Sequence, residues 1–85
     1  MELKELFEQA VANSKLITTR PDNDTLLKLY SLYKQATEGN APADAPSNPF
    51  DFIAKAKYNA WAELDGMSAD SAMQQYVDLA ERLRG

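Results

Sequence analysis

Apolar residues recur every three or four positions in four separate stretches of this chain. Along the chain this helical periodicity dominates over the apolar-polar alternation expected of a half-buried strand. The apolar positions are Leu3, Leu6, Phe7, Ala10 and Val11; Leu26 to Ala36; Phe52 to Leu64; and Ala72 to Leu83. The pattern predicts four amphipathic helices of roughly three to four turns each, enough to bury a shared core as an all-α four-helix bundle.

Helix-breaking and capping residues predict where the first helix ends and where the second begins and ends. The first helix should fade near Asn13–Ser14, because the segment that follows carries residues that favour extended backbone and leads into Pro21. Asp22, Asn23 and Asp24 are candidate caps for the second helix. Gly39 is the expected stop for that helix.

A proline-containing connection, residues 40–48, separates the second and third helices and reads as a surface loop within one domain. Asn48 is the expected cap of the third helix, with Pro49 in its first turn and Asp51 near its amino end. That helix should run through Leu64 and stop before Gly66, and Ser68 and Asp70 should start the fourth.

Length and composition limit the class of protein. Eighty-five residues, 45% of them apolar, predict a single domain over residues 1–85 with a modest core. The charged amino-terminal segment and the lack of a run of about 18 apolar residues predict neither a secretion signal nor a stable membrane insertion. Together with the absence of cysteine, this favours a cytoplasmic location. A formal net charge of −4 disfavours nucleic-acid binding.

The residue types also limit the chemistry. The chain has no histidine and no cysteine, which excludes a Ser-His-Asp or Cys-His arrangement and the usual metal-binding motifs. Its three glycines do not form a phosphate-binding loop. The glutamates near the amino terminus fit a solvated helix face. We therefore expect a protein without catalytic activity, metal or cofactor.

Two tyrosines and a lysine near the end of the second predicted helix favour binding of a small anion. Tyr30, Tyr33 and Lys34 are spaced to lie along one side of a helix, and Lys57 follows in the third. Ammonium and phenol groups both donate hydrogen bonds to phosphate, and a tyrosine ring offers a flat surface to a purine. The set fits an adenine nucleotide, although aromatic residues at this spacing also commonly belong to a core.

Three blocks of the sequence are similar to the acyl-CoA-binding protein family: Tyr30–Gly39, Asp51–Gly66, and Ser68 with Ala72–Tyr76. The resemblance covers nearly the whole chain, with the blocks in the same order. It implies an up-down-down-up bundle in which the second and third helices are parallel. It also implies a monomeric protein that carries acyl-CoA esters and has the enzymes that produce or use these esters as its partners.

The resemblance further implies the binding residues. Tyr30, Lys34 and Lys57 would gather the 3′-phosphate of coenzyme A, and Tyr33 and Tyr76 would contact the adenine and ribose. Apolar contact with the acyl chain is implied for Leu27. The complete predicted site consists of Lys15, Tyr30, Ser31, Leu32, Tyr33, Lys34, Ile53, Lys57 and Tyr76.

Some positions depart from the pattern common in this family. Ile53 stands in place of a frequent polar or basic residue, Tyr58 in place of a tryptophan and Ala54 in place of a glycine. The residues expected to bind the head group are unaffected by these changes. The length of the preferred acyl chain, however, does not follow from the sequence. Trp61 is expected in the core, and Lys55 is either at the rim of the site or an ordinary solvated lysine.

The sequence therefore predicts a non-catalytic carrier of medium- to long-chain acyl-CoA. One alternative is a helical protein-protein interaction module in which exposed tyrosines dock a partner. An enzyme acting on the thioester is a third possibility.

Overall fold

Four helices make up the described part of the chain, residues 2–14, 21–43 and 50–84 of a computed structural model. They are α1 (Leu3–Ser14), α2 (Asn23–Glu38), α3 (Phe52–Ala62) and α4 (Ala69–Arg84). No strand occurs within these ranges. The all-α prediction is confirmed.

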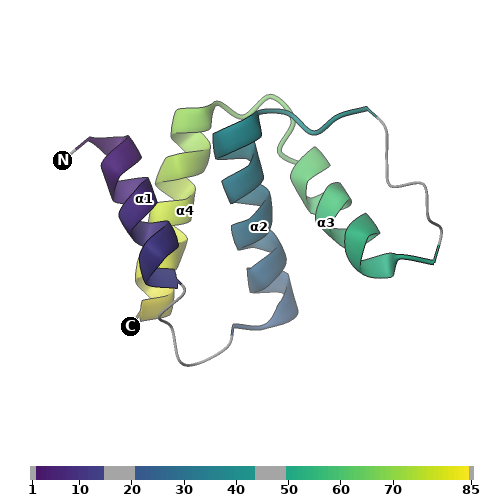
Figure 1. Cartoon of the computed structure of the whole chain (residues 1–85), viewed down its shortest axis with the longest axis horizontal. Helices are drawn as coiled ribbons and strands as arrows, with labels where there is room; N and C mark the ends of the chain where they lie inside the picture. The colour runs from purple at the N-terminus through teal and green to yellow at the C-terminus, as the bar shows by residue number, and fades with distance from the viewer. Residues whose placement is uncertain (1, 15–20, 44–49, 85) are drawn as a thin grey trace.

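The direction of the helices follows the up-down-down-up order (Figure 1). The helices α2 and α3 run parallel to each other, and α1 and α4 run in the opposite direction. Contacts between elements join α4 to both α1 and α2, and join α2 to α3. Because α3 lies outside the group formed by the other three helices, the molecule is flat, with extents of 40 × 28 × 15 Å.

The core is formed by α1, α2 and α4. Its buried residues are Phe7, Ala10, Leu29, Leu32, Ala36, Ala72, Tyr76, Val77 and Ala80. Ala72 and Ala80 are 0% and 1% exposed, so α4 presents small side chains where it packs between its neighbours. This packing fixes the relative positions of α1 and α2, which carry most of the predicted site.

The ends of α2 agree with the sequence prediction. Among the three candidate caps, the Asp22 carboxylate accepts a hydrogen bond from the backbone N–H of Thr25 at 2.7 Å. Hydrogen bonding from the side chain of Thr25, and then from its backbone N–H, holds the pKa of Asp22 below its usual value. At the other end, Gly39 adopts a φ of 81°, a conformation that favours glycine and lets the chain leave the helix.

The ends of α3 differ from the prediction. Asn48 and Pro49 lie outside the described residues, but α3 begins at Phe52, and its cap is Asp51, whose carboxylate accepts from the N–H of Ala54 at 2.9 Å. The prediction that Asn48 caps this helix was therefore wrong. Proline spacing indicated an early start, whereas the carboxylate at 51 satisfies the free N–H groups of the actual first turn.

The helix also stops earlier than predicted. It ends at Ala62, and a turn over residues 63–66 follows, in which the N–H groups of Leu64 and Asp65 reach back three residues. Gly66, with a φ of 89°, completes the turn. The prediction that α3 continues through Leu64 was wrong because these shorter bonds replace the α-helical ones.

Trp61 anchors α3 to α2. Its side chain is buried, and its indole N–H donates to the backbone carbonyl of Gly39 at 2.8 Å. The expectation that Trp61 is buried is confirmed. None of the described helices has the length and apolar character needed to cross a membrane.

Candidate functional site

The ring of Tyr30 on α2 has two ammonium groups above it. The Nζ atom of Lys34 lies 5.9 Å from the ring centroid, and that of Lys57 on α3 lies 5.3 Å from it. Both distances fall within the range of a cation–π interaction. Three predicted site residues, separated by up to 27 positions in sequence, are thus brought together because α2 and α3 run side by side.

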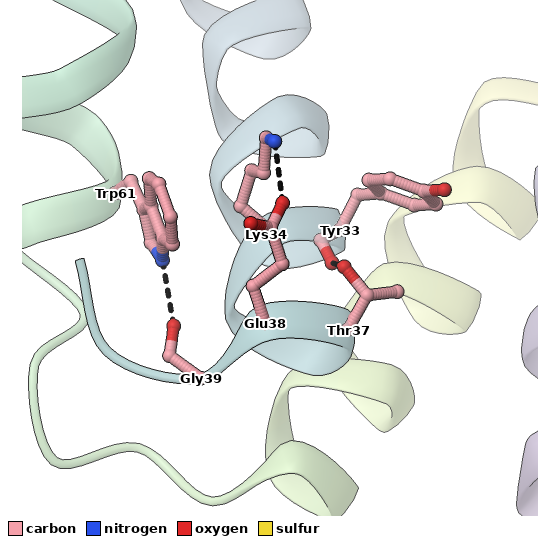
Figure 2. A network of polar contacts seen from close by, with 6 residues as sticks. All are labelled: Tyr33, Lys34, Thr37, Glu38, Gly39 and Trp61. Carbon is pink, nitrogen blue, oxygen red and sulfur yellow. Dashed lines mark hydrogen bonds and ion pairs between the residues drawn. The ribbon is translucent and has the colours of Figure 1, made fainter. Parts of the chain in front are cut away.

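Lys34 has further partners on the side facing α3 (Figure 2). Its Nζ lies 5.5 Å from the Trp61 ring and forms an ion pair with the Glu38 carboxylate at 2.5 Å. The hydrogen bond to Glu38 is the main reason why the pKa of Lys34 is raised. Lys34 is therefore fully charged at neutral pH and already has an anionic partner on its own helix.

Tyr33 points to a different side of α2 from Lys34 (Figure 2). Its ring is stacked on Phe7 of α1, with centroids 6.0 Å apart and planes at 25°. Phe7 also meets Tyr76 of α4 edge to face, with centroids 5.2 Å apart. A row of three aromatic rings therefore joins α1, α2 and α4.

Two cavities border this row of rings and share the lining residues Val11 and Tyr33. One has a volume of about 310 Å³ and is lined by Val11, Ser14, Pro21, Leu26, Leu29, Tyr30, Tyr33 and Tyr76. The other has a volume of about 450 Å³ and is lined by Lys4, Phe7, Glu8, Val11, Tyr33, Ala36, Thr37 and Met73. The 310 Å³ cavity therefore connects Tyr30, which lies beneath the two lysines, with Tyr33 and Tyr76, the tyrosines predicted to contact a purine.

Tyr76 is positioned by α1 as well as by its own helix. It is 5% exposed, and its hydroxyl shares a hydrogen bond with the Ser14 hydroxyl at 3.2 Å. Ser14 in turn donates to the carbonyl of Val11 at 2.7 Å. Tyr76 thus reaches the 310 Å³ cavity with a fixed orientation.

The remaining predicted residues do not join this cluster. Ser31 and Leu32 are 2% and 1% exposed, and the Ser31 hydroxyl donates to the carbonyl of Lys28. Ile53 is 71% exposed near the start of α3 and lines neither cavity. Lys15 lies outside the described residues. Ligand contact by these four residues stays a prediction.

Sequence reasoning missed three residues that shape the site: Phe7, Ser14 and Glu38. Phe7 was assigned to a core stripe, and its contact with Tyr33 depends on how α1 meets α2. The role of Ser14 likewise depends on a contact across 62 positions. Glu38 was detectable, because it follows Lys34 by four residues on one helix.

The cluster brings together groups that can bind an anion through non-covalent contacts. It offers ammonium groups, phenol hydroxyls and aromatic faces, which suit an anion attached to a flat ring. Within the ranges that the structure describes, no group of acidic, histidine or cysteine residues is placed to hold a metal ion.

Comparisons with known proteins agree with this arrangement. Residues 4–80 match the family model described as acyl CoA binding protein. The chain is 47% identical to acyl-CoA-binding protein homolog 1 of Caenorhabditis elegans over 77 residues, 91% of this chain and 88% of that protein. It is 46% identical over 77 residues to enoyl-CoA delta isomerase 2 of Rattus norvegicus, where the match covers 91% of this chain but 19% of the isomerase.

A solved structure gives the same result for the fold. The crystal structure of Oryza sativa acyl-CoA-binding protein 2 superposes with a TM-score of 0.91 at 32% sequence identity, covering 98% of this chain and 91% of that one. Sequence and fold thus agree over nearly the full length. The chain belongs to the acyl-CoA-binding protein family.

Proposed function

We propose that this protein binds medium- to long-chain acyl-CoA thioesters and carries them without breaking the thioester. The observation that carries the proposal is the convergence of Lys34 and Lys57, from two helices, on the ring of Tyr30. An anion beside this ring would be attracted by both ammonium groups, of which that of Lys34 is also paired with the Glu38 carboxylate. Family membership supports coenzyme A as the source of that anion.

The 3′-phosphate of coenzyme A is the anion that we assign to this cluster. The two ammonium groups supply charge-assisted donors, and the Tyr30 hydroxyl supplies a neutral one. Lys34 and Lys57 each carry one positive charge, and a phosphate dianion carries two negative charges. Since the cluster is near the surface, we expect this part of the binding energy to fall as salt is added.

The 310 Å³ cavity is the proposed site of the adenine ring. It adjoins Tyr30 and is lined by Tyr33 and Tyr76, which supply aromatic faces. The Phe7 contact holds Tyr33 in place, and the Ser14 hydroxyl holds Tyr76. A ligand with a purine next to a phosphate would therefore meet rings that are already oriented.

The acyl chain would supply the larger part of the affinity. Removing a methylene from water gains about 0.8 kcal/mol, so ten shielded methylenes would gain about 8 kcal/mol before ordering costs. Apolar contact by Leu27 and Ile53 is part of this proposal. Such a protein would bind acyl-CoA more tightly than free coenzyme A, and the lysines would favour the thioester over free fatty acid.

The proposed carrier is a monomer with one binding domain over residues 1–85, acting in the cytoplasm. Its partners would be the acyl-CoA esters and the enzymes that make or use them. The match to part of an isomerase means that this type of domain also occurs within an enzyme. Release of free thiol from palmitoyl-CoA during incubation with the protein would contradict the non-catalytic proposal.

Isothermal titration calorimetry of the protein with palmitoyl-CoA, free coenzyme A and palmitate tests the proposal. We expect one-to-one tight binding of palmitoyl-CoA, much weaker binding of either half, and a clear loss with Lys34→Ala. No heat with palmitoyl-CoA below its micelle range, together with unchanged Trp61 fluorescence, would overturn the proposal. That result would instead favour the protein-interaction module.

A further inference from the structure

The negative charge of Glu38 does not stabilise α2, the helix on which it lies. It is the last residue of α2, where the helix dipole favours a positive charge, and the last turn of α2 contains no basic residue. The order of the pair, lysine first and glutamate four residues later, is also the less favourable one on a helix. Helix stability therefore does not explain the Glu38 side chain.

The surroundings of Lys34 do explain where that side chain lies. The Nζ atom of Lys34 lies 5.9 Å from the centroid of the Tyr30 ring and 5.5 Å from that of the Trp61 ring. The Glu38 carboxylate is paired with the same Nζ (Figure 2). The Lys34 side chain is 27% exposed, whereas that of Glu38 is 52% exposed. The lysine is thus the more enclosed partner of the pair, and the carboxylate is the more exposed one.

This pairing changes the charge that an incoming anion meets. Lys34 and Glu38 together have no net charge, and one of the three Lys34 donors is already used. A phosphate that approaches Lys34 must displace the carboxylate or accept its repulsion at short range.

We propose that Glu38 competes with the ligand's phosphate for Lys34 and so lowers the affinity of the site for the 3′-phosphorylated head group. The inference rests on the proposed function, because it takes the phosphate of coenzyme A as the ligand of Lys34. Glu38 thereby sets how much of the binding energy comes from the head group. A weaker head-group contribution would make the protein release the thioester more readily to an enzyme that uses it.

The test is the affinity of Glu38→Gln for palmitoyl-CoA and for palmitoyl-dephospho-CoA, which lacks the 3′-phosphate. We expect Glu38→Gln to bind palmitoyl-CoA roughly three- to tenfold more tightly than the wild type, since a repelling charge is removed beside a dianion. The affinity for the dephospho ligand should change little. Urea unfolding should show no loss of stability.

Two controls separate this effect from a change in net charge. Glu81→Gln makes the same change of charge at an exposed position on α4, beside a cavity that shares no lining residue with the two described above. It should leave both affinities unchanged. In a Lys34→Ala background, the gain from Glu38→Gln should largely disappear, because the competition needs Lys34.

The outcomes distinguish this inference from the function on which it rests. If the wild type binds palmitoyl-CoA but Glu38→Gln binds it no more tightly, or gains equally for both ligands, the role of Glu38 is overturned and the carrier function stands. If the wild type does not bind palmitoyl-CoA, both proposals fail.

Discussion

Phe7 of α1 and Tyr33 of α2 stack with ring centroids 6.0 Å apart and planes at 25°, and Tyr33 lines both cavities of the candidate site. Phe7 is 4% exposed, whereas Tyr33 is 40% exposed. The buried ring therefore supports the exposed one. A core residue on α1 thus helps to orient a residue proposed to bind the ligand.

Phe7→Ala should lower the free energy of unfolding by about 3–5 kcal/mol, because a buried ring is lost and a void remains. Urea denaturation followed by circular dichroism measures the loss. Phe52→Ala is the matched control, since Phe52 is 74% exposed and should lose little stability. Equal losses in the two variants would contradict the assignment of Phe7 to the core.

Lys57→Gln should weaken palmitoyl-CoA binding by about tenfold, as expected for loss of one charge-assisted hydrogen bond, and should reduce the salt dependence of the affinity. Calorimetry at low and high salt measures both effects. Lys28→Gln is the control, because it removes the same charge from an exposed position on α2 that lines neither described cavity. A similar loss with Lys28→Gln would mean that general charge, rather than the contact with Tyr30, governs binding.

Trp61→Phe should reduce stability by about 1 kcal/mol or somewhat more, because the Gly39 carbonyl loses its donor and the smaller ring fills the space less well. Tyr58→Phe provides a comparison on the same helix. It removes an exposed hydrogen bond from the Tyr58 hydroxyl to the carbonyl of Pro42, so its loss should be smaller. Urea midpoints that rank the two variants in the reverse order would contradict this account.

Asp22 should contribute to the acid sensitivity of the fold. Its pKa is lower in the folded state than in the unfolded state, so its stabilisation is present above the unfolded value of about 3.9 and is lost as pH falls through the folded value. Asp22→Asn keeps a capping oxygen but does not titrate. The melting temperature of that variant should therefore fall less than that of the wild type between about pH 5 and pH 2. Parallel curves for the two proteins would argue against this role.

The sequence predicted the helices better than their ends. Apolar spacing identified all four, and a side-chain cap with a glycine stop placed α2 closely, since both signals act within one turn. The start of α3 was misplaced because several residues before it can cap a helix, and the choice of Asp51 depends on which turn actually forms.

The residues that lie together at the candidate site were predicted from the sequence when they share one helix or lie on two parallel neighbouring helices. Tyr30, Lys34 and Lys57 were named from sequence and lie together. The roles of Phe7 and Ser14 could not be predicted, because their contacts depend on the angle and distance at which α1 meets α2 and α4. Periodicity gives the face of a helix but not its partner.

The position of α3 outside the core has a consequence for hydrogen exchange. In the described part of the chain, α3 packs against α2 and contacts neither α1 nor α4, so its amides can exchange by a local opening that leaves the rest folded. A phosphate held between Lys34 and Lys57 would join α3 to α2, and its binding energy would add to the cost of that opening. The ligand would then hold α3 against α2, and the exchange rates of the α3 amides would report what fraction of the protein has ligand bound.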